Sequence, residues 1–179
     1  KVRTAIADSL NRRFGESFRM ENIFMTCGAA ASLNICLKAL LNAGEEVITF
    51  APFFPEYRVW VEGVGATLNV IPAKLPDFQI DAAAFGQAIT PKTKVVIVNT
   101  PNNPSGVVYS EETIKNLCTI LKKKSEEYGA PIYLITDEPY REIVYDDIKV
   151  PYLTKYYDNT LVCYSYSKSL SLPGERIGY

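Results

Sequence analysis

The chain carries, close to its end, a lysine set among hydroxyl side chains and followed by an arginine. Lys168 lies between Ser165 and Arg176, and Ser165 directly follows the β-rich run 161–164. A lysine amine at a strand end can form a Schiff base with an aldehyde, and hydroxyls with a guanidinium suit a phosphate group. The segment therefore predicts a site for a phosphorylated aldehyde. For Lys168 alone, the alternative is a solvated lysine in a polar loop.

A carboxylate ends another apolar strand. Asp137 directly follows the apolar run 132–136, and Pro139 and Tyr140 come next. A charged carboxylate at the end of a buried strand is costly unless it pairs with a cation or a protonated nitrogen. Asp137 is therefore a candidate partner for a ligand nitrogen such as that of a pyridinium. The alternative is a helix N-cap, since Pro139 suits the first turn of a helix.

Two further strand ends carry residues that suit a ligand. Gly28-Ala29-Ala30 turns from a short strand into a helix, where free backbone N–H groups and the helix dipole attract anions. Asn103 lies in the turn-rich loop 99–106, and two X-Pro steps there stiffen the loop and fix the direction of the amide. The alternatives are a helix start that serves packing alone and an ordinary Asn-Pro turn.

Aromatic residues gather in the loop 52–57, which also contains two prolines. An aromatic face in this loop could stack on a flat ring, whereas a lid packed on the core is the alternative. All of these polar and aromatic groups follow predicted strands. In open α/β sheets, ligands bind at that place.

Composition excludes several classes of function. The 179 residues contain no histidine, which rules out Ser-His-Asp and Cys-His catalysis and most zinc sites. The formal net charge is -1 without a basic block, which argues against nucleic acid or an anionic membrane surface as a partner. No apolar run approaches the roughly 20 residues that span a bilayer. Four scattered cysteines without a C-x-x-C pair predict buried thiols in a reducing cytoplasm.

Helical and strand patterns alternate along the whole chain. Helices are predicted over residues 2–14, 29–41, 56–64, 81–89 and 111–128, with Asp81 and Ser110 as N-caps. Strands are predicted over residues 23–26, 46–50, 67–71, 94–99, 132–136 and 161–164. The run 95–98 is too uniformly apolar to face water. The alternation predicts a three-layer α/β/α fold in which helices cover both faces of a mostly parallel sheet.

We expect residues 1–179 to form a single domain. No linker, internal repeat or low-complexity segment divides the chain, and its length suffices for one full core. Residues 176–179 look like the start of a further strand, and a strand cut short would expose unpaired backbone groups. The chain also starts at Lys1 rather than Met. We therefore expect a domain excised from a longer protein.

Taken together, the motifs resemble one known family. In chain order they are N-P-S-G at 103–106, D-E-P-Y at 137–140, S-x-S-K at 165–168 and R-x-G at 176–178. This order and spacing resembles the fold-type I pyridoxal-phosphate enzymes, specifically the class I/II aminotransferases of the aspartate aminotransferase family. The resemblance covers about residues 20–179. It implies the pyridoxal-phosphate-dependent transferase fold, with this chain as its cofactor-binding large domain and pyridoxal 5'-phosphate as the cofactor.

The resemblance also implies a role for each motif residue. Lys168 resembles the Schiff-base lysine that later serves as general base, and Asp137 resembles the partner of the pyridine nitrogen. The other implied contacts are with the phosphate (Gly28, Ala29, Ala30, Ser165, Arg176), the phenolic oxygen (Asn103, Tyr140) and the ring face (Phe54). The implied catalytic residues are Lys168, Asp137 and Tyr140. Many relatives carry a hydroxyl where this chain has Ala29 and Ala30, so we expect a somewhat lower phosphate affinity.

The implied activity is transfer of an amino group between an amino acid and a 2-oxo acid by a ping-pong mechanism. The resemblance further implies a homodimer of the full-length protein. The family's small domain, with the arginine that holds the substrate carboxylate, follows the point where this chain ends. The upstream segment that completes a partner subunit's site is missing as well, so the isolated chain can bind cofactor and still be inactive.

Three other functions remain open from the sequence. A β-lyase or a cyclopropane-forming synthase would share the same cofactor residues. A non-catalytic ligand-sensing module of a transcription regulator would share the fold. A serine acyl-enzyme would match S-x-x-K at 165–168, but the chain lacks the S-D-N and K-T-G motifs that such an enzyme needs.

Overall fold

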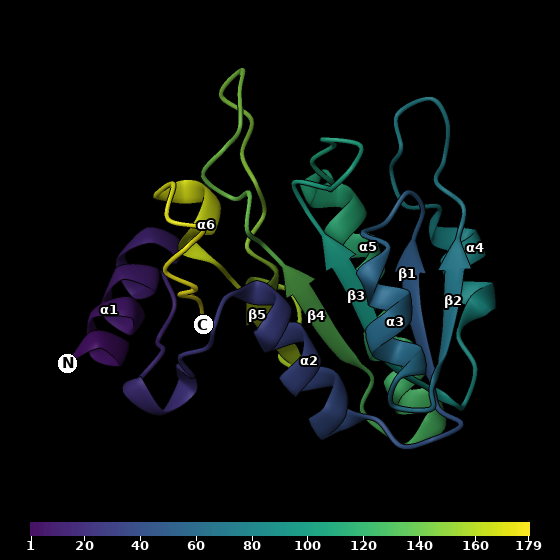
Figure 1. Ribbon diagram of the computed structural model, residues 1–179. Helices are drawn as coiled ribbons and strands as arrows, with labels where there is room; N and C mark the ends of the chain where they lie inside the picture. The colour runs from purple at the N-terminus through teal and green to yellow at the C-terminus, as the bar shows by residue number, and fades with distance from the viewer.

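A five-stranded parallel sheet forms the centre of the molecule (Figure 1). The computed structural model describes residues 1–179. The strands, in the spatial order β2-β1-β3-β4-β5, are β2 (Thr67–Ile71), β1 (Glu46–Phe50), β3 (Thr93–Asn99), β4 (Tyr133–Asp137) and β5 (Thr160–Cys163). Every neighbouring pair is parallel. The carboxyl ends of all five strands therefore lie at one edge of the sheet, which is where open α/β sheets bind ligands.

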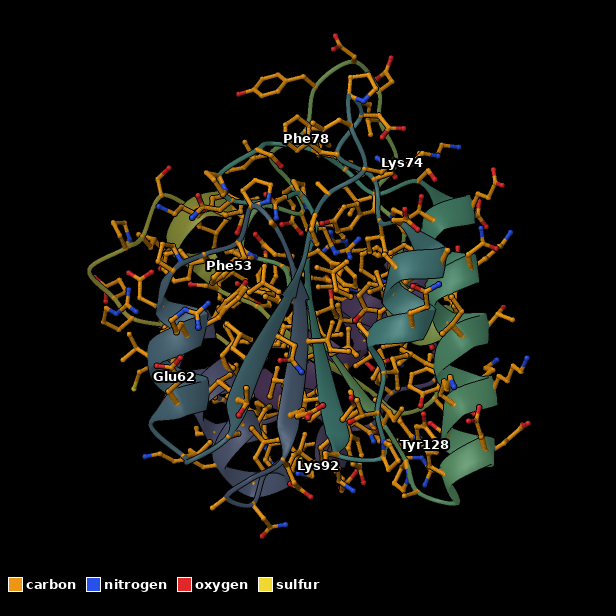
Figure 2. All side chains as sticks on the ribbon, turned by 90° about the vertical axis from the view of Figure 1, so that its right-hand side faces the viewer. Phe53, Glu62, Lys74, Phe78, Lys92 and Tyr128 are labelled. Carbon is orange, nitrogen blue, oxygen red and sulfur yellow. The ribbon has the colours of Figure 1, made fainter.

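Helices cover both faces of this sheet. Helices α2 (Ala29–Leu40) and α3 (Glu56–Glu62) lie on one face, and α4 (Ala82–Ala88) and α5 (Glu111–Tyr128) lie on the other. Helix α1 (Val2–Phe14) and the short α6 (Tyr166–Ser169) lie beyond the β5 edge (Figure 1). Figure 2 shows the layers edge-on, with Glu62 of α3 on one side of the strands and Tyr128 of α5 on the other. The predicted three-layer α/β/α fold is confirmed. None of the helices combines the length and the apolarity needed to cross a membrane.

Alternate residues of β3 belong to two separate cores. Val95 and Ile97 pack with side chains of α2 and α3, among them Leu33, Leu37, Tyr57 and Val61. Val96 and Val98 pack with α5 residues that include Ile114, Leu117 and Leu121. Successive strand side chains point to opposite faces, so a strand covered on both faces must be apolar at every position. This explains the uninterrupted apolar run that the sequence shows.

The predicted strand 23–26 is wrong. Residues Met20–Asn22 form a 3-10 turn, and of the next residues only Thr26 pairs, through an isolated bridge to Gly178. A ladder needs a partner strand along its whole length, and this segment meets only the short stretch around Gly178. The strand start predicted at 176–179 likewise forms bridges and no ladder, and Arg176 has a positive φ of 51°. Gly178 pairs with Thr26 and Ser165, and Tyr179 exchanges two backbone hydrogen bonds with Tyr164.

The remaining elements follow the predictions closely. Asp81 and Ser110 cap α4 and α5, and their side chains accept backbone N–H groups of the first turn. Helix α3 ends at Glu62 rather than at residue 64, because the backbone turns at Gly63–Gly65, and Gly65 has a positive φ of 79°. The sequence did not predict α6, whose four residues are too few to show a helical period. This short helix carries Lys168.

Candidate active site

A cavity of about 210 Å³ lies at the carboxyl ends of β3, β4 and β5. Nine of the ten site residues predicted from the sequence line it, and the tenth, Gly28, directly precedes two of them. The nine are Ala29, Ala30, Phe54, Asn103, Asp137, Tyr140, Ser165, Lys168 and Arg176. The fold thus brings together residues that are up to 147 positions apart, from Ala29 to Arg176. Leu33, Trp60, Pro139, Ser167 and Pro173 complete the wall.

Asp137 is buried at the end of β4 with one oxygen unpaired. The Tyr57 hydroxyl donates to Asp137 Oδ2 at 2.6 Å, whereas Oδ1 is buried and has no hydrogen-bond partner. Burial raises the pKa of Asp137 to about 7; the Tyr57 hydrogen bond opposes this rise and the Glu138 charge adds to it. No helix follows Asp137, so the N-cap alternative is wrong. A buried acceptor without a donor is costly, and it marks a place where a ligand can supply one.

Asn99 organises the loop that presents Asn103. Its amide nitrogen donates to the Asp137 carbonyl at 2.8 Å, and its amide oxygen accepts the Asn103 N–H at 2.6 Å. Asn102 ties the same loop to the aromatic segment by donating to the Pro52 carbonyl at 3.2 Å. The Asn-Pro turn is therefore present and also directs Asn103 toward the cavity. We did not single out Asn99 from the sequence, although a polar residue that ends an apolar strand was the available signal.

Phe54 belongs to both the core and the cavity. Its ring packs on the cluster under α2 and α3, and it meets the Tyr57 ring edge-on with 5.7 Å between centroids. Another side of the same residue lines the cavity, together with Trp60. The two alternatives for this loop therefore do not exclude each other, because Phe54 packs on the core and also presents an aromatic face to the cavity. A flat ligand ring would find an immobile, half-buried face there.

The turn before α2 meets Ser165 and Arg176. Gly28 has a φ of 94°, and a Cβ at this position would lie 2.9 Å from Arg176 Nη2 and 3.6 Å from Ser165 Oγ. Arg176 is held by donating to the carbonyls of Cys27 at 3.2 Å and Pro173 at 3.1 Å. The first N–H groups of a helix have no acceptor within the helix. A guanidinium, a hydroxyl and free N–H groups therefore converge, as an anion such as phosphate requires.

Lys168 reaches the cavity from α6. Ser165 caps this helix by accepting the Ser167 N–H at 3.2 Å, so the hydroxyl both starts the helix and lines the cavity. The Lys168 side chain is exposed, and its Nζ lies 6.0 Å from the centroid of the Tyr140 ring. Burial and the nearby Asp137 charge raise the pKa of Tyr140. The site therefore offers one primary amine, with a phenol beside it that stays protonated.

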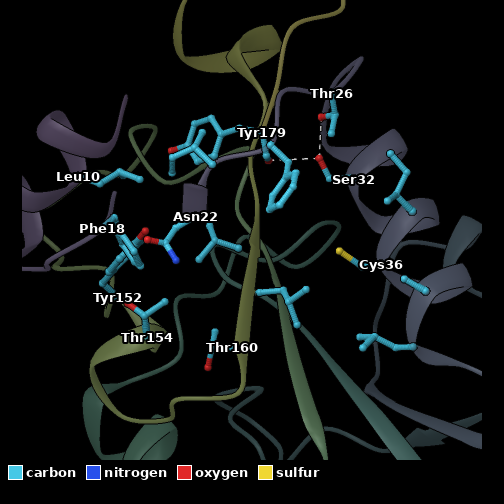
Figure 3. A pocket seen from close by; sticks show the side chains of 17 residues that line it. Leu10, Phe18, Asn22, Thr26, Ser32, Cys36, Tyr152, Thr154, Thr160 and Tyr179 are labelled. Carbon is cyan, nitrogen blue, oxygen red and sulfur yellow. Dashed lines mark hydrogen bonds between the residues drawn. The ribbon is translucent and has the colours of Figure 1, made fainter. Parts of the chain in front are cut away.

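A second cavity, shown in Figure 3, lies beside β5, with α2 on one side and α1 and the segment 18–26 on the other, and it is mainly apolar. It holds about 370 Å³, and no charged residue lines it. Ser32 there bonds to Thr26 Oγ1 at 2.7 Å and to the Tyr179 carbonyl at 3.2 Å. These bonds tie α2 to the segment after Arg176. This cavity has no acidic or basic side chain, so it lacks the chemistry of the first cavity. In the chain as a whole, no group of three His, Cys, Asp or Glu side chains is placed to hold a metal ion.

Comparison with known proteins assigns the chain to a family. Residues 1–179 match the family model described as aminotransferase class I and II. The chain belongs to this family. It is 32% identical to the aspartate aminotransferase of Thermotoga maritima, over 100% of this chain and 47% of that protein. It is 31% identical to a probable N-acetyl-LL-diaminopimelate aminotransferase of Bacillus subtilis, over 100% of this chain and 44% of that one.

Solved structures of aminotransferases share the fold. An aminotransferase from Eubacterium rectale is 63% identical and superposes with a TM-score of 0.97, covering 99% of this chain and 45% of that one. The aspartate aminotransferase from Thermus thermophilus with maleate is 30% identical with a TM-score of 0.90, again covering 99% and 45%. The chain thus spans about half the length of the curated relatives and solved structures that it matches.

Proposed function

We propose that residues 1–179 form one pyridoxal 5'-phosphate-binding domain of an aminotransferase, which moves an amino group between an amino acid and a 2-oxo acid. The observation that carries this proposal is the unpaired, buried Asp137 Oδ1 in the same cavity as Lys168. Family membership supports the reaction class, and relatives named for aspartate and for N-acetyl-LL-diaminopimelate support amino acids as the substrate class.

The residues of the cavity fit this cofactor at each of its functional groups. Gly28, Ala29, Ala30, Ser165 and Arg176 would hold the phosphate, Phe54 the ring face, and Asn103 with Tyr140 the phenolic oxygen. Asp137 Oδ1 would accept a hydrogen bond from the protonated ring nitrogen, which satisfies the one unpaired oxygen. When bound, the cofactor supplies an aldehyde that takes up amino groups and a ring that draws electrons from the substrate Cα.

The chain's own residues then have distinct tasks. Lys168 Nζ anchors the cofactor and afterwards takes the proton from the substrate Cα, acting as the general base. Asp137 stabilises the proton on the ring nitrogen, because an anion within hydrogen-bond distance favours the charged form. Tyr140 donates a hydrogen bond, since its raised pKa keeps the phenol protonated. The aromatic wall of Phe54 and Trp60 excludes water from one side of the site.

The proposal extends to assembly and location. We propose that the full-length protein is a homodimer, as the family resemblance implies, and that it lies in the cytoplasm. Large exposed apolar side chains, such as Phe24 at 71% and Ile35 at 57%, support a contact surface. The four cysteines are free, which supports a reducing compartment. The expectation that their thiols are buried holds for Cys118 and Cys163, but it is wrong for exposed Cys27 and half-buried Cys36. Light scattering of the full-length protein tests the assembly. We expect the mass of two protomers, and the mass of one protomer would contradict the proposal.

Reductive trapping tests the cofactor site. The purified protein is mixed with pyridoxal 5'-phosphate and reduced with sodium borohydride, and the modified lysine is located by peptide mass spectrometry. We expect one equivalent of label on Lys168 and none in Lys168→Ala. Lys122→Ala, which removes an exposed lysine on α5, is the matched control and should label fully. Label spread over surface lysines in the unchanged protein would overturn the proposal.

A further inference from the structure

Tyr57, at the end of the aromatic segment 52–57, is the protein partner of the Asp137 carboxylate, and we did not predict this pairing from the sequence. Its hydroxyl donates to Oδ2 at 2.6 Å across 80 positions of sequence. The tyrosine side chain is fully buried on α3, and burial followed by the Asp137 charge raises its pKa well above the ordinary value. The phenol therefore stays protonated and remains a donor. No ion pair involves Asp137, so no cation of the protein competes for this carboxylate.

Three neighbouring aromatic rings hold the Tyr57 ring, and they thereby restrict the position of its hydroxyl. The ring stacks on Phe53 with centroids 6.4 Å apart, meets Phe54 at 5.7 Å and contacts Trp60 at 6.1 Å. The Tyr57 N–H also donates to the Phe54 carbonyl at 3.1 Å, which holds the start of α3 against the aromatic loop. A donor fixed in this way fixes the plane of the carboxylate that accepts from it.

The groups that face Asp137 make this single donor important. Those from neighbouring elements are Tyr57 on α3, Glu138 and Tyr140 after β4, and Cys163 on β5. Each of them is neutral or acidic. The Tyr57 O–H is therefore the group that stabilises the Asp137 anion before any ligand enters.

We propose that Tyr57 is a positioning residue for Asp137: by holding Oδ2 it leaves Oδ1 turned to the protonated ring nitrogen of the cofactor. The inference rests on the proposed function, since it concerns the same cavity. It adds a residue that touches neither the cofactor nor the substrate and acts through the carboxylate. A purely structural tyrosine, bonded to Asp137 only because a buried hydroxyl needs an acceptor, is the alternative that the experiment must separate.

The test compares two ligands that differ at the ring nitrogen. Pyridoxal 5'-phosphate and its 1-deaza analogue, in which C–H replaces the ring nitrogen, are titrated into the purified protein. Trp60, the single tryptophan of the chain and part of the cavity wall, reports binding by fluorescence. In Tyr57→Phe we expect the affinity for pyridoxal 5'-phosphate to fall about 10-fold or more, as for loss of one hydrogen bond to a charged group. The affinity for the analogue should not change.

Tyr157→Phe is the matched control. Tyr157 is also buried and its hydroxyl also donates at 2.6 Å, to the Ile132 carbonyl, but it packs on the opposite face of the sheet. This variant should bind both ligands as the unchanged protein does. If Tyr57→Phe weakens both ligands equally, Tyr57 only shapes the cavity and the inference is wrong. If it weakens neither, the inference is wrong as well.

A double-mutant cycle separates an effect that Tyr57 exerts through Asp137 from a general effect on the shape of the cavity. If Tyr57 acts through Asp137, Tyr57→Phe should weaken pyridoxal 5'-phosphate binding in the unchanged background but not in Asp137→Asn. Equal losses in both backgrounds would overturn the inference. Failure of the proposed function has a different signature. The unchanged protein itself would then not discriminate the two ligands, and borohydride would not label Lys168.

Discussion

Asp137 shows how a single buried residue can cost stability at the site that we propose for the cofactor. Its pKa of about 7 lies above the ordinary 3.8, so the folded chain holds this proton at a pH where the unfolded chain has lost it. This uptake of a proton by Asp137 stabilises the folded state. The contribution is complete below about pH 4 and is lost as the pH rises to about 7. Asp137→Asn removes this dependence, because the amide does not titrate.

We therefore expect ligand-free Asp137→Asn to be more resistant to unfolding than the unchanged protein at neutral and higher pH. Between about pH 5 and pH 8 its advantage should grow by roughly 2–3 kcal/mol, at about 1.4 kcal/mol per pH unit. Urea unfolding of both proteins at the two pH values measures the difference. An advantage that stays constant with pH would show that Asp137 is ionised in the folded state throughout.

Gly28 is a second residue whose identity the local geometry dictates. Gly28→Ala places a Cβ 2.9 Å from Arg176 Nη2 on a backbone with a φ of 94°. We expect a loss of about 1–3 kcal/mol in the free energy of unfolding and weaker binding of pyridoxal 5'-phosphate, because Arg176 must move. Gly15→Ala is the control, since Gly15 also has a positive φ, of 68°, but no atom within 4 Å. Gly15→Ala should lower stability without weakening binding. Equal losses of binding in both variants would show that the turn at Gly28 and Arg176 does not form the phosphate site.

At the scale of elements, Arg141 holds the segment after β4 against α1. It pairs with Glu138, donates to the carbonyls of Val150 at 3.1 Å and Pro151 at 3.0 Å, and lies over the rings of Phe14 and Tyr152. Glu138 is 1% exposed. Removal of Arg141 would leave this buried carboxylate without a cation, with only the Thr136 hydroxyl still donating to Oε1 at 2.8 Å.

We expect Arg141→Met to lower the free energy of unfolding by about 3–5 kcal/mol. Arg13→Met is the comparison, because it breaks the Arg13–Glu142 ion pair. The two side chains are 2.6 Å apart, but the arginine side chain is 43% exposed. This variant should lower the free energy of unfolding by about 1 kcal/mol or less. Chemical denaturation of both variants at one pH makes the comparison. Similar losses would show that burial does not separate the two ion pairs.

The elements also show what the sequence could and could not predict. Long periodic segments such as α5 and the apolar strand β3 were predicted within one residue, because their patterns reflect burial on one or both faces. The strand 23–26 failed because pairing depends on a partner that no local pattern reveals. The motifs identified the residues of the cavity. They missed Tyr57 and Asn99, whose partners lie 80 and 38 positions away and are known only from the fold.

The whole molecule converges on one edge of the sheet. The cavity draws on the start of α2, the aromatic loop before α3 and the ends of β3, β4 and β5. A ligand that bridges these elements must stabilise them together. Since a ligand that binds only the folded state adds RT ln(1 + [L]/Kd), saturation at 100 times Kd contributes about 2.7 kcal/mol. For a chain of this size that raises the midpoint of thermal unfolding by about 5–10 °C.

Thermal unfolding with two ligands tests whether the cavity works as one unit. Pyridoxal 5'-phosphate at saturation should raise the midpoint by the full amount, whereas inorganic phosphate, which reaches only the Gly28 and Arg176 end, should raise it less. Arg176→Gln should abolish the phosphate effect and reduce that of the cofactor, and Lys168→Ala should reduce only the cofactor effect. If phosphate alone produced the whole shift, the anion cradle would account for binding, and the ring-side residues Asp137 and Tyr140 would not contribute to it. A cofactor shift that requires both ends shows that elements far apart in sequence are stabilised together, because one ligand spans the edge that the parallel sheet assembles.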